Sequence, residues 1–135
     1  MNYWTKISFV VFALGISIIA WVQINNLTRP SSAPVPVIQK LYFEGTIGGK
    51  HAMSISIDQV GRNITGTVIN THREIRKLKG SISEDKTFLF SEYLKDQVTG
   101  TFEGKILSNG NMRGSWSAPP GVKRYPFYLN RKQRI

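Results

Sequence analysis

A short phrase of a polar residue, glycine, serine or threonine, and a large apolar residue occurs five times between residues 44 and 116. Its glycines are Gly45, Gly66, Gly80, Gly100 and Gly114. Every second glycine of this series follows after 34 or 35 residues, which indicates an internal repeat. The flanking segments alternate between apolar and polar residues and are rich in β-branched and aromatic side chains, as strands are. The repeat is therefore predicted to consist of strands and not of helices.

The alternation also predicts which side chains share the concave face of the sheet. Residues two apart in a strand point to the same side, so each glycine shares its face with the large residue two positions later. Those large residues are Ile47, Val68, Ile82, Phe102 and Trp116. The same face is predicted to carry Leu41, Phe43, Met53, Ile55, Ile57, Ile64, Leu78, Phe88, Phe90, Val98, Gly104, Ile106, Met112, Tyr125, Phe127 and Leu129. A small residue beside a large one lets strands coil sharply enough to close a small barrel.

The whole pattern predicts an all-β fold, a single antiparallel up-and-down barrel of about eight short strands. The predicted strands span residues 41–48, 51–58, 63–70, 75–83, 87–94, 98–107, 112–118 and 125–130. The connections between them are short and rich in Gly, Asn, Asp and Pro, so neighbouring strands are expected to pair as a meander. A long meander closes or leaves two exposed edges, and the inward glycines favour closure. Glycines alone do not decide whether the interior is filled or holds a cavity.

The N-terminal segment has a different character. Residues 7–22 read ISFVVFALGISIIAWV without a charge, and residues 3–24 as a helix would reach roughly 33 Å, enough for a bilayer core of about 30 Å. Residues 1–26 are therefore predicted to be an uncleaved transmembrane signal-anchor; a cleaved signal peptide and a buried core helix are the alternatives. Residues 27–39, which read LTRPSSAPVPVIQ, are predicted to be a Pro/Ser-rich linker. Residues 40–135 are predicted to be the barrel domain.

The composition indicates a cellular location and a class of binding partner. With 18 Lys and Arg against 8 Asp and Glu, the formal net charge of +10 favours anionic partners. The absence of cysteine excludes disulfides, thiol nucleophiles and thiolate metal sites. Together with the anchor, these features predict a bacterial inner-membrane protein, single-pass, with its C-terminal domain in the periplasm or outside the cell.

Six basic residues are the candidates for binding an anion. Arg73, Arg76, Lys77 and Lys79 fall within seven residues, and Lys123 and Arg124 precede the last predicted strand. Anionic lipid or polysaccharide is the expected ligand of such clusters in an envelope. Tyrosines interleaved with charge near the last strand also suit single-stranded nucleic acid, a less favoured partner for an exported domain.

Glu92, Phe102 and Trp116 are the candidates for binding a ligand inside the barrel. Glu92 shares its face with Phe90, so its carboxylate is predicted to point inward, where it needs an arginine, a tyrosine or backbone donors as partners. The two histidines, His51 and His72, are too few to predict a metal site, and no catalytic motif occurs. The chain is therefore predicted to have no enzymatic activity, no cofactor and no metal.

The chain resembles small bacterial β-barrel domains of the lipocalin and avidin kind. The resemblance rests on the glycine phrases, on FLFSEY around Phe90 and Glu92, and on Gly114-x-Trp116 followed by YPFYL. The resemblance covers about two-thirds of the chain, from about Tyr42 to Leu129, and is closest to envelope domains of mostly unassigned function. It implies a calycin-type barrel. The polar and Trp side chains with which avidin-like proteins hold their ligand cannot be matched residue by residue, so biotin binding is not implied.

The expected function is that of a membrane-anchored, non-enzymatic binding domain of the bacterial envelope, which recognises an anionic envelope component or a protein partner. Two alternatives stay open. One is a carrier of a small apolar ligand inside the barrel, and the other is a nucleic-acid-binding barrel.

Overall fold

A computed structural model describes residues 33–134 of the chain. The predicted signal-anchor over residues 1–26 and the first part of the linker lie outside these residues. Within the described part, no helix is long and apolar enough to cross a membrane.

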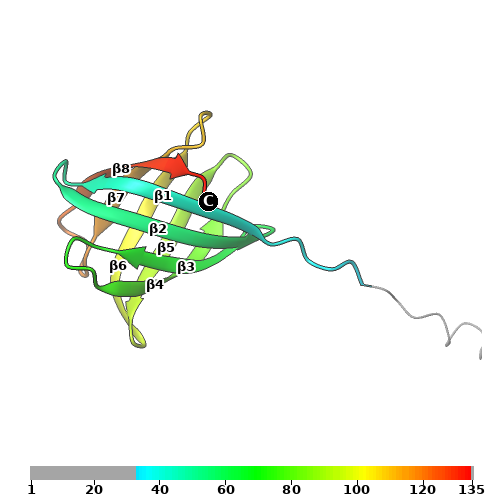
Figure 1. The fold of residues 1–135 in the computed structure, drawn as a ribbon. Coiled ribbons are helices and arrows are strands. Elements are labelled where there is room, and N and C mark those ends of the chain that lie inside the picture. The colour runs from blue at the N-terminus through cyan, green and yellow to red at the C-terminus, as the bar shows by residue number, and fades with distance from the viewer. Residues whose placement is uncertain (1–32, 135) are drawn as a thin grey trace, which may run out of the picture. The chain divides into compact units, whose positions relative to one another are not determined.

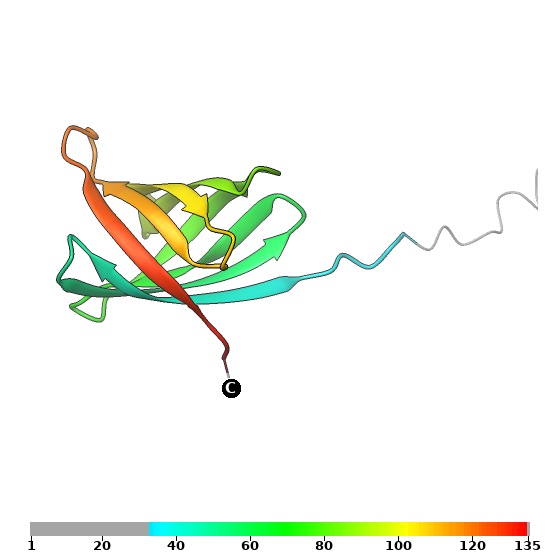
Figure 2. The same cartoon turned by 90° about the horizontal axis from the view of Figure 1, so that it is seen from above.

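Eight antiparallel strands form one closed barrel in chain order, as predicted (Figure 1). They are β1 (Gln39–Ile47), β2 (His51–Val60), β3 (Asn63–Ile69), β4 (Ile75–Ile82), β5 (Thr87–Leu94), β6 (Gln97–Ile106), β7 (Met112–Ser117) and β8 (Tyr125–Lys132). Their bounds differ from the predicted ones by at most two residues. The last strand pairs with the first, with Gly45 opposite Leu129, so the sheet has no free edge (Figure 2).

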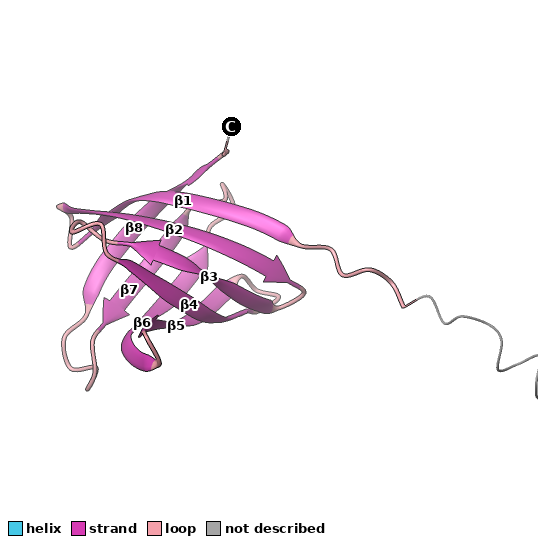
Figure 3. Ribbon diagram, turned by 60° about the horizontal axis from the view of Figure 1, so that its bottom comes forward, coloured by secondary structure: helices cyan, strands magenta, loops and turns pink. Residues whose placement is uncertain are grey.

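The two ends of the barrel differ in what they carry (Figure 3). One end, here called the attachment end, holds the start of β1, where residues 33–38 enter, together with turns 61–62, 83–86 and 107–111 and the end of β8. The other end, here called the mouth, holds loops 48–50, 70–74, 95–96 and 118–124.

The middle of the barrel is filled by the apolar residues predicted to face inward. Phe43, Ile55, Phe90 and Leu129 are fully buried. Aromatic rings occupy much of the centre: Phe88 and Phe90 stack with centroids 4.7 Å apart, and Phe102 meets Phe127 edge-on at 5.5 Å. Burial of these side chains is the main source of the barrel's stability.

Most of the inward glycines lie directly against the backbone of a neighbouring strand. At five of them, a side-chain Cβ would overlap a backbone carbonyl oxygen of the next strand; these are Gly45, Gly66, Gly80, Gly104 and Gly114. At Gly80 the overlapping atom is the oxygen of Leu89 on β5. The neighbouring backbone thus occupies the place of the missing side chain, so these positions have no room for a larger residue.

A β-bulge changes the alternation of β6 near the mouth. Glu92 pairs with Gly100 but the next residue, Tyr93, pairs with Val98, which leaves Thr99 as the extra residue. The prediction that Val98 faces inward is therefore wrong: Val98 is 45% exposed, because the extra residue turns it to the outside. Tyr125 keeps the predicted alternation but is 40% exposed, since it begins β8 at the rim of the mouth.

Candidate functional site

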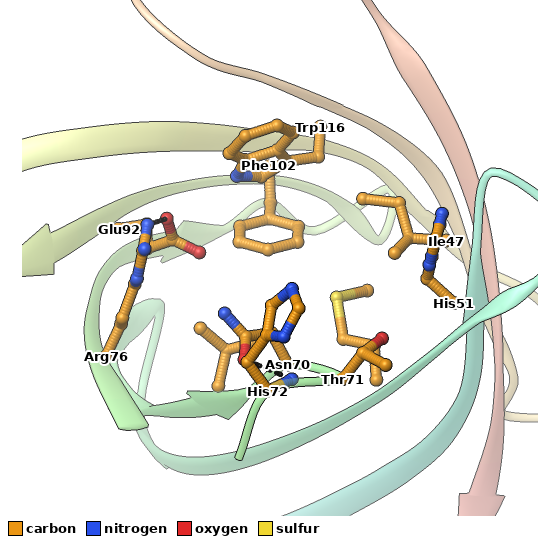
Figure 4. A pocket seen from close by; sticks show the side chains of 11 residues that line it. Ile47, His51, Asn70, Thr71, His72, Arg76, Glu92, Phe102 and Trp116 are labelled. Carbon is orange, nitrogen blue, oxygen red and sulfur yellow. Dashed lines mark hydrogen bonds and ion pairs between the residues drawn. The ribbon is translucent and has the colours of Figure 1, made fainter. Parts of the chain in front are cut away.

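A pocket of about 300 Å³ opens at the mouth of the barrel (Figure 4). Its apolar wall consists of Ile47, Met53, Val68, Phe102 and Trp116. Its polar wall consists of His51, Asn70, Thr71, His72, Arg76 and Glu92. The pocket therefore brings together the three residues predicted to bind a ligand, Glu92, Phe102 and Trp116, which come from three different strands.

The Glu92 carboxylate is held by two donors at one of its oxygens. Glu92 is 5% exposed and points inward, as predicted. Nη1 of Arg76 donates to Glu92 Oε1 at 3.0 Å, and Thr99 Oγ1 donates to the same oxygen at 2.8 Å. Thr99 is the bulge residue, so the irregularity in β6 delivers a donor to the one acidic side chain buried within residues 33–134.

Arg76 also binds a second carboxylate. Its Nε and Nη2 donate to Glu74 Oε2 at 3.2 and 2.7 Å. The hydrogen bonds from Arg76 hold the pKa of Glu74 below its ordinary value. The carboxylates of Glu74 and then Glu92 raise the pKa of Arg76, so its guanidinium stays charged. One cation thus serves two anions, and the three side chains together carry a net charge of −1.

The indole of Trp116 lies across the backbone of Gly100. A Cβ at Gly100 would overlap the indole Nε1, so the absence of a side chain there lets the ring settle. Gly100 is the register partner of Glu92, which places this end of the ring next to the buried acid. The Trp116 Nε1 is buried and has no hydrogen-bond partner among the described residues.

Three aromatic rings form one side of the mouth. The centroids of Trp116 and Phe102 are 6.5 Å apart, and those of Trp116 and Tyr125 are 6.0 Å apart. In Figure 4 the side chains of Glu92 and Arg76 lie on one side of the pocket and Ile47 lies across from them. The site therefore joins an aromatic face to a charged one.

The rim is shaped by the side chain of Asn70. Its Oδ1 accepts hydrogen bonds from the backbone N–H of His72 at 3.0 Å and of Glu74 at 3.2 Å. Thr71 Oγ1 donates to the carbonyl of Ala52 at 3.1 Å, which ties the loop to β2. These bonds fix loop 70–74 beside the pocket in an Asx-type turn.

The sequence interpretation missed two features of this site. The sequence predicts Arg76 as one of six anion-binding residues and not as the partner of Glu92, although it lies two residues before Leu78, and alternation alone places both on the inner face. The sequence does not predict that Asn70 and Thr71 line the pocket, because they lie in a loop, where the backbone conformation and not strand alternation decides where a side chain points.

The six residues predicted to bind an anion do not gather in one cluster. Arg76 points inward, whereas Lys77 and Lys79 are exposed on the outer face of β4, with Lys79 Nζ 5.7 Å from the centroid of the Tyr93 ring. Arg73 lies in loop 70–74 and Lys123 in loop 118–124. Arg124 forms an ion pair with Glu103. The alternation of β4 therefore places Arg76 on the inner face and its neighbours Lys77 and Lys79 on the outer face, and the charge of Arg124 is already paired.

A second hollow, of about 610 Å³, lies at the attachment end and is bordered by four cations. These are Lys40, Arg131, Lys132 and Arg134. Lys132 stands opposite Tyr42 in the β1–β8 ladder, and the guanidinium of Arg134 lies 5.8 Å from the centre of the Tyr42 ring. Lys40 pairs with Asp58 at 3.8 Å, which offsets one of the four charges.

No set of three or more His, Cys, Asp or Glu side chains suited to a metal ion occurs within residues 33–134. No protein-family model, curated protein or solved structure matches the chain. What can be said of its function therefore comes from the barrel and its pocket.

Proposed function

We propose that this protein is a non-enzymatic binding barrel that holds a small, partly apolar ligand in the pocket at its mouth. The observation that carries the proposal is a pocket of about 300 Å³ that joins an apolar wall to a few convergent polar groups. Small-molecule sites have this composition, and this volume is at the lower end of their range, about 300–1,000 Å³. The calycin-type resemblance of the sequence agrees with the proposal, since small barrels hold ligands in their mouths.

Binding is favoured over catalysis by the way the polar wall is arranged. Arg76 donates hydrogen bonds to Glu74 and Glu92, so the three charged side chains hold one another in place. A general acid or base needs a group within reach of a substrate proton and a pKa suited to the transfer. A fixed ion pair instead serves to position a ligand.

The proposed setting is the bacterial envelope. Residues 1–26 would anchor the chain in the inner membrane, and the barrel would lie in the periplasm or outside the cell. The linker enters at the start of β1, whereas the pocket opens at the other end of the barrel. Intact mass of the protein extracted from membranes tests the anchor: a chain that begins near Trp21 would rule it out.

A variant that fills the pocket tests the ligand site. Ile47→Trp would place an indole in the mouth, and Thr46→Trp would place the same ring on the outer face of β1, where Thr46 is exposed. Three probes of one shape and different charge are used, namely benzylamine, benzyl alcohol and benzoate, with binding followed by NMR shifts of the full chain in detergent micelles. We expect at least one probe to bind the parent and the Thr46→Trp variant but not Ile47→Trp. Equal shifts in all three proteins, or none in any, would refute the proposal.

A second candidate function is attachment to an anionic lipid surface. The observation that favours it is the hollow bordered by Lys40, Arg131, Lys132 and Arg134, which lies at the end where the linker joins. Phosphate groups of lipids attract such clusters, and the attraction is screened over about 8 Å at physiological ionic strength. This candidate keeps the anionic partner expected from the net charge but assigns it to different residues.

Vesicle sedimentation of residues 33–135 tests the second candidate, because every strand and its core lie within that segment. Changing Lys40, Lys132 and Arg134 to Glu should abolish binding to vesicles that contain phosphatidylglycerol. The matched control changes Lys50, Lys95 and Lys123 at the mouth to Glu, with the same change in net charge. If both triple variants lose binding equally, net charge and not this hollow is responsible.

A further inference from the structure

We infer that the ligand of the mouth pocket is a cation, an ammonium group carried on a small apolar body. This inference rests on the proposed function, because it names the chemical class of the ligand that the pocket would take. It is opposite in sign to what the net charge of +10 suggests.

The engagement of Arg76 is the first argument. The charged side chains that line the pocket are Arg76 and Glu92, a cation and an anion. All three nitrogens of the Arg76 guanidinium already donate to carboxylates, Nη1 to Glu92 and Nε and Nη2 to Glu74 outside the lining. An incoming anion would have to compete with these carboxylates for Arg76, whereas an incoming cation would not.

The free oxygen of Glu92 is the second argument. Both hydrogen bonds to this carboxylate end on Oε1, while Oε2 accepts none from the residues that the structure describes. Glu92 lines the pocket, and its side chain is only 7% exposed. Among the described residues, Trp116 Nε1 is the buried side-chain polar atom without a partner, so Glu92 Oε2 stays accessible from the pocket. An ammonium group there would donate a charge-assisted hydrogen bond to it.

The aromatic wall is the third argument. Phe102 and Trp116 both line the pocket, and the Trp116 Nε1 is buried over Gly100. A ligand therefore meets ring carbons and not the N–H. Ring faces attract cations within about 6 Å of their centroids, and aromatic walls combined with a carboxylate are a common way to hold ammonium groups.

The three probes named above test this inference with the full chain. Benzylamine, a cation at neutral pH, should bind about tenfold more tightly than benzyl alcohol, the ratio that about 1.4 kcal/mol gives. Benzoate should bind more weakly than the alcohol. Glu92→Gln keeps the shape of the side chain and removes its charge, so the preference for the amine should disappear while the alcohol still binds.

Two further variants separate the outcomes. Glu103→Gln, on the adjacent strand β6 and paired outside with Arg124, removes the same charge and should leave the preference intact. Glu74→Gln, at the rim with a side chain 39% exposed, should lower the preference even if Glu92→Gln fails to fold. If benzoate or the alcohol binds as well as the amine, or if the preference survives both Glu92→Gln and Glu74→Gln, the cationic ligand is overturned and the binding pocket still stands. Failure of all three probes would overturn the proposed function itself.

Discussion

The indole of Trp116 occupies the space that a side chain at Gly100 would need. The two residues lie on different strands, β6 and β7, and the indole of Trp116 forms part of the lining of the mouth pocket. The other inward glycines of the repeated phrase accommodate the backbone of a neighbouring strand instead. Gly100 therefore differs from its repeats: it makes room for a side chain at the site.

This difference predicts how two glycine substitutions behave. Gly100→Ala should destabilise the barrel by about 1–3 kcal/mol, because the new methyl group displaces the indole. In a Trp116→Ala background the same change should cost much less, since the obstacle is gone. Gly80→Ala is the control: its Cβ meets the Leu89 carbonyl, so Trp116→Ala should not relieve it. Urea titration of the single and double variants measures the coupling, and no coupling between residues 100 and 116 would contradict the contact.

Trp116→Phe is expected to lower the free energy of unfolding by less than is usual for substitution of a buried aromatic residue. It removes an N–H that has no partner among the described residues, and an unpaired buried donor costs about 1–3 kcal/mol. That gain should offset much of the packing lost with the smaller ring. Phe102→Leu removes no polar group and serves as the comparison in urea titrations. A larger loss for Trp116→Phe than for Phe102→Leu would show that the indole N–H is satisfied.

Arg76→Met should destabilise the barrel through Glu92. The methionine would leave the buried carboxylate without its cation, and removal of one partner of a buried pair costs about 3–5 kcal/mol. A loss near the lower end of this range is expected, because the Arg76 side chain is 22% exposed and the pair is therefore partly solvated. The double change Arg76→Met and Glu92→Gln should recover most of the loss, since no buried charge is then left without a partner. The remaining carboxylate, Glu74, has a side chain that is 39% exposed. Thermal unfolding at neutral pH would contradict this reading if the double variant were the less stable.

Acid should weaken the barrel partly through Glu74. Its pKa is lowered in the folded state by the hydrogen bonds from Arg76, so its contribution to stability is full above the ordinary glutamate pKa, about 4.3, and is lost as the pH falls through the lowered value. Glu74→Gln should therefore lose less stability than the parent between about pH 6 and pH 3. Asp96→Asn, which removes an exposed carboxylate of the mouth loop 95–96, controls for the change in net charge. Equal acid sensitivity of the parent and Glu74→Gln in urea titrations would exclude this contribution.

The sequence by itself determined the strands, their faces and the closure of the sheet. Alternation with period two is a local property, so Phe43, Ile55 and Phe90 could be assigned to the interior without knowledge of their neighbours. The same rule turned Glu92 inward. The inward glycines predicted tight coiling because a missing side chain has the same consequence wherever strands approach closely.

The tertiary structure alone decided what those inward groups meet. The register between β4 and β5 brings Arg76 to Glu92 across 16 residues of chain, and a basic cluster in the sequence becomes an internal ion pair with exposed lysines beside it. The bulge that turns Val98 outward and Thr99 toward Glu92 depends on pairing between strands, which alternation along one strand does not contain. The placement of Trp116 over Gly100 is likewise a contact between strands. Local pattern fixes the side of the sheet on which a residue lies, whereas register and closure fix its partner.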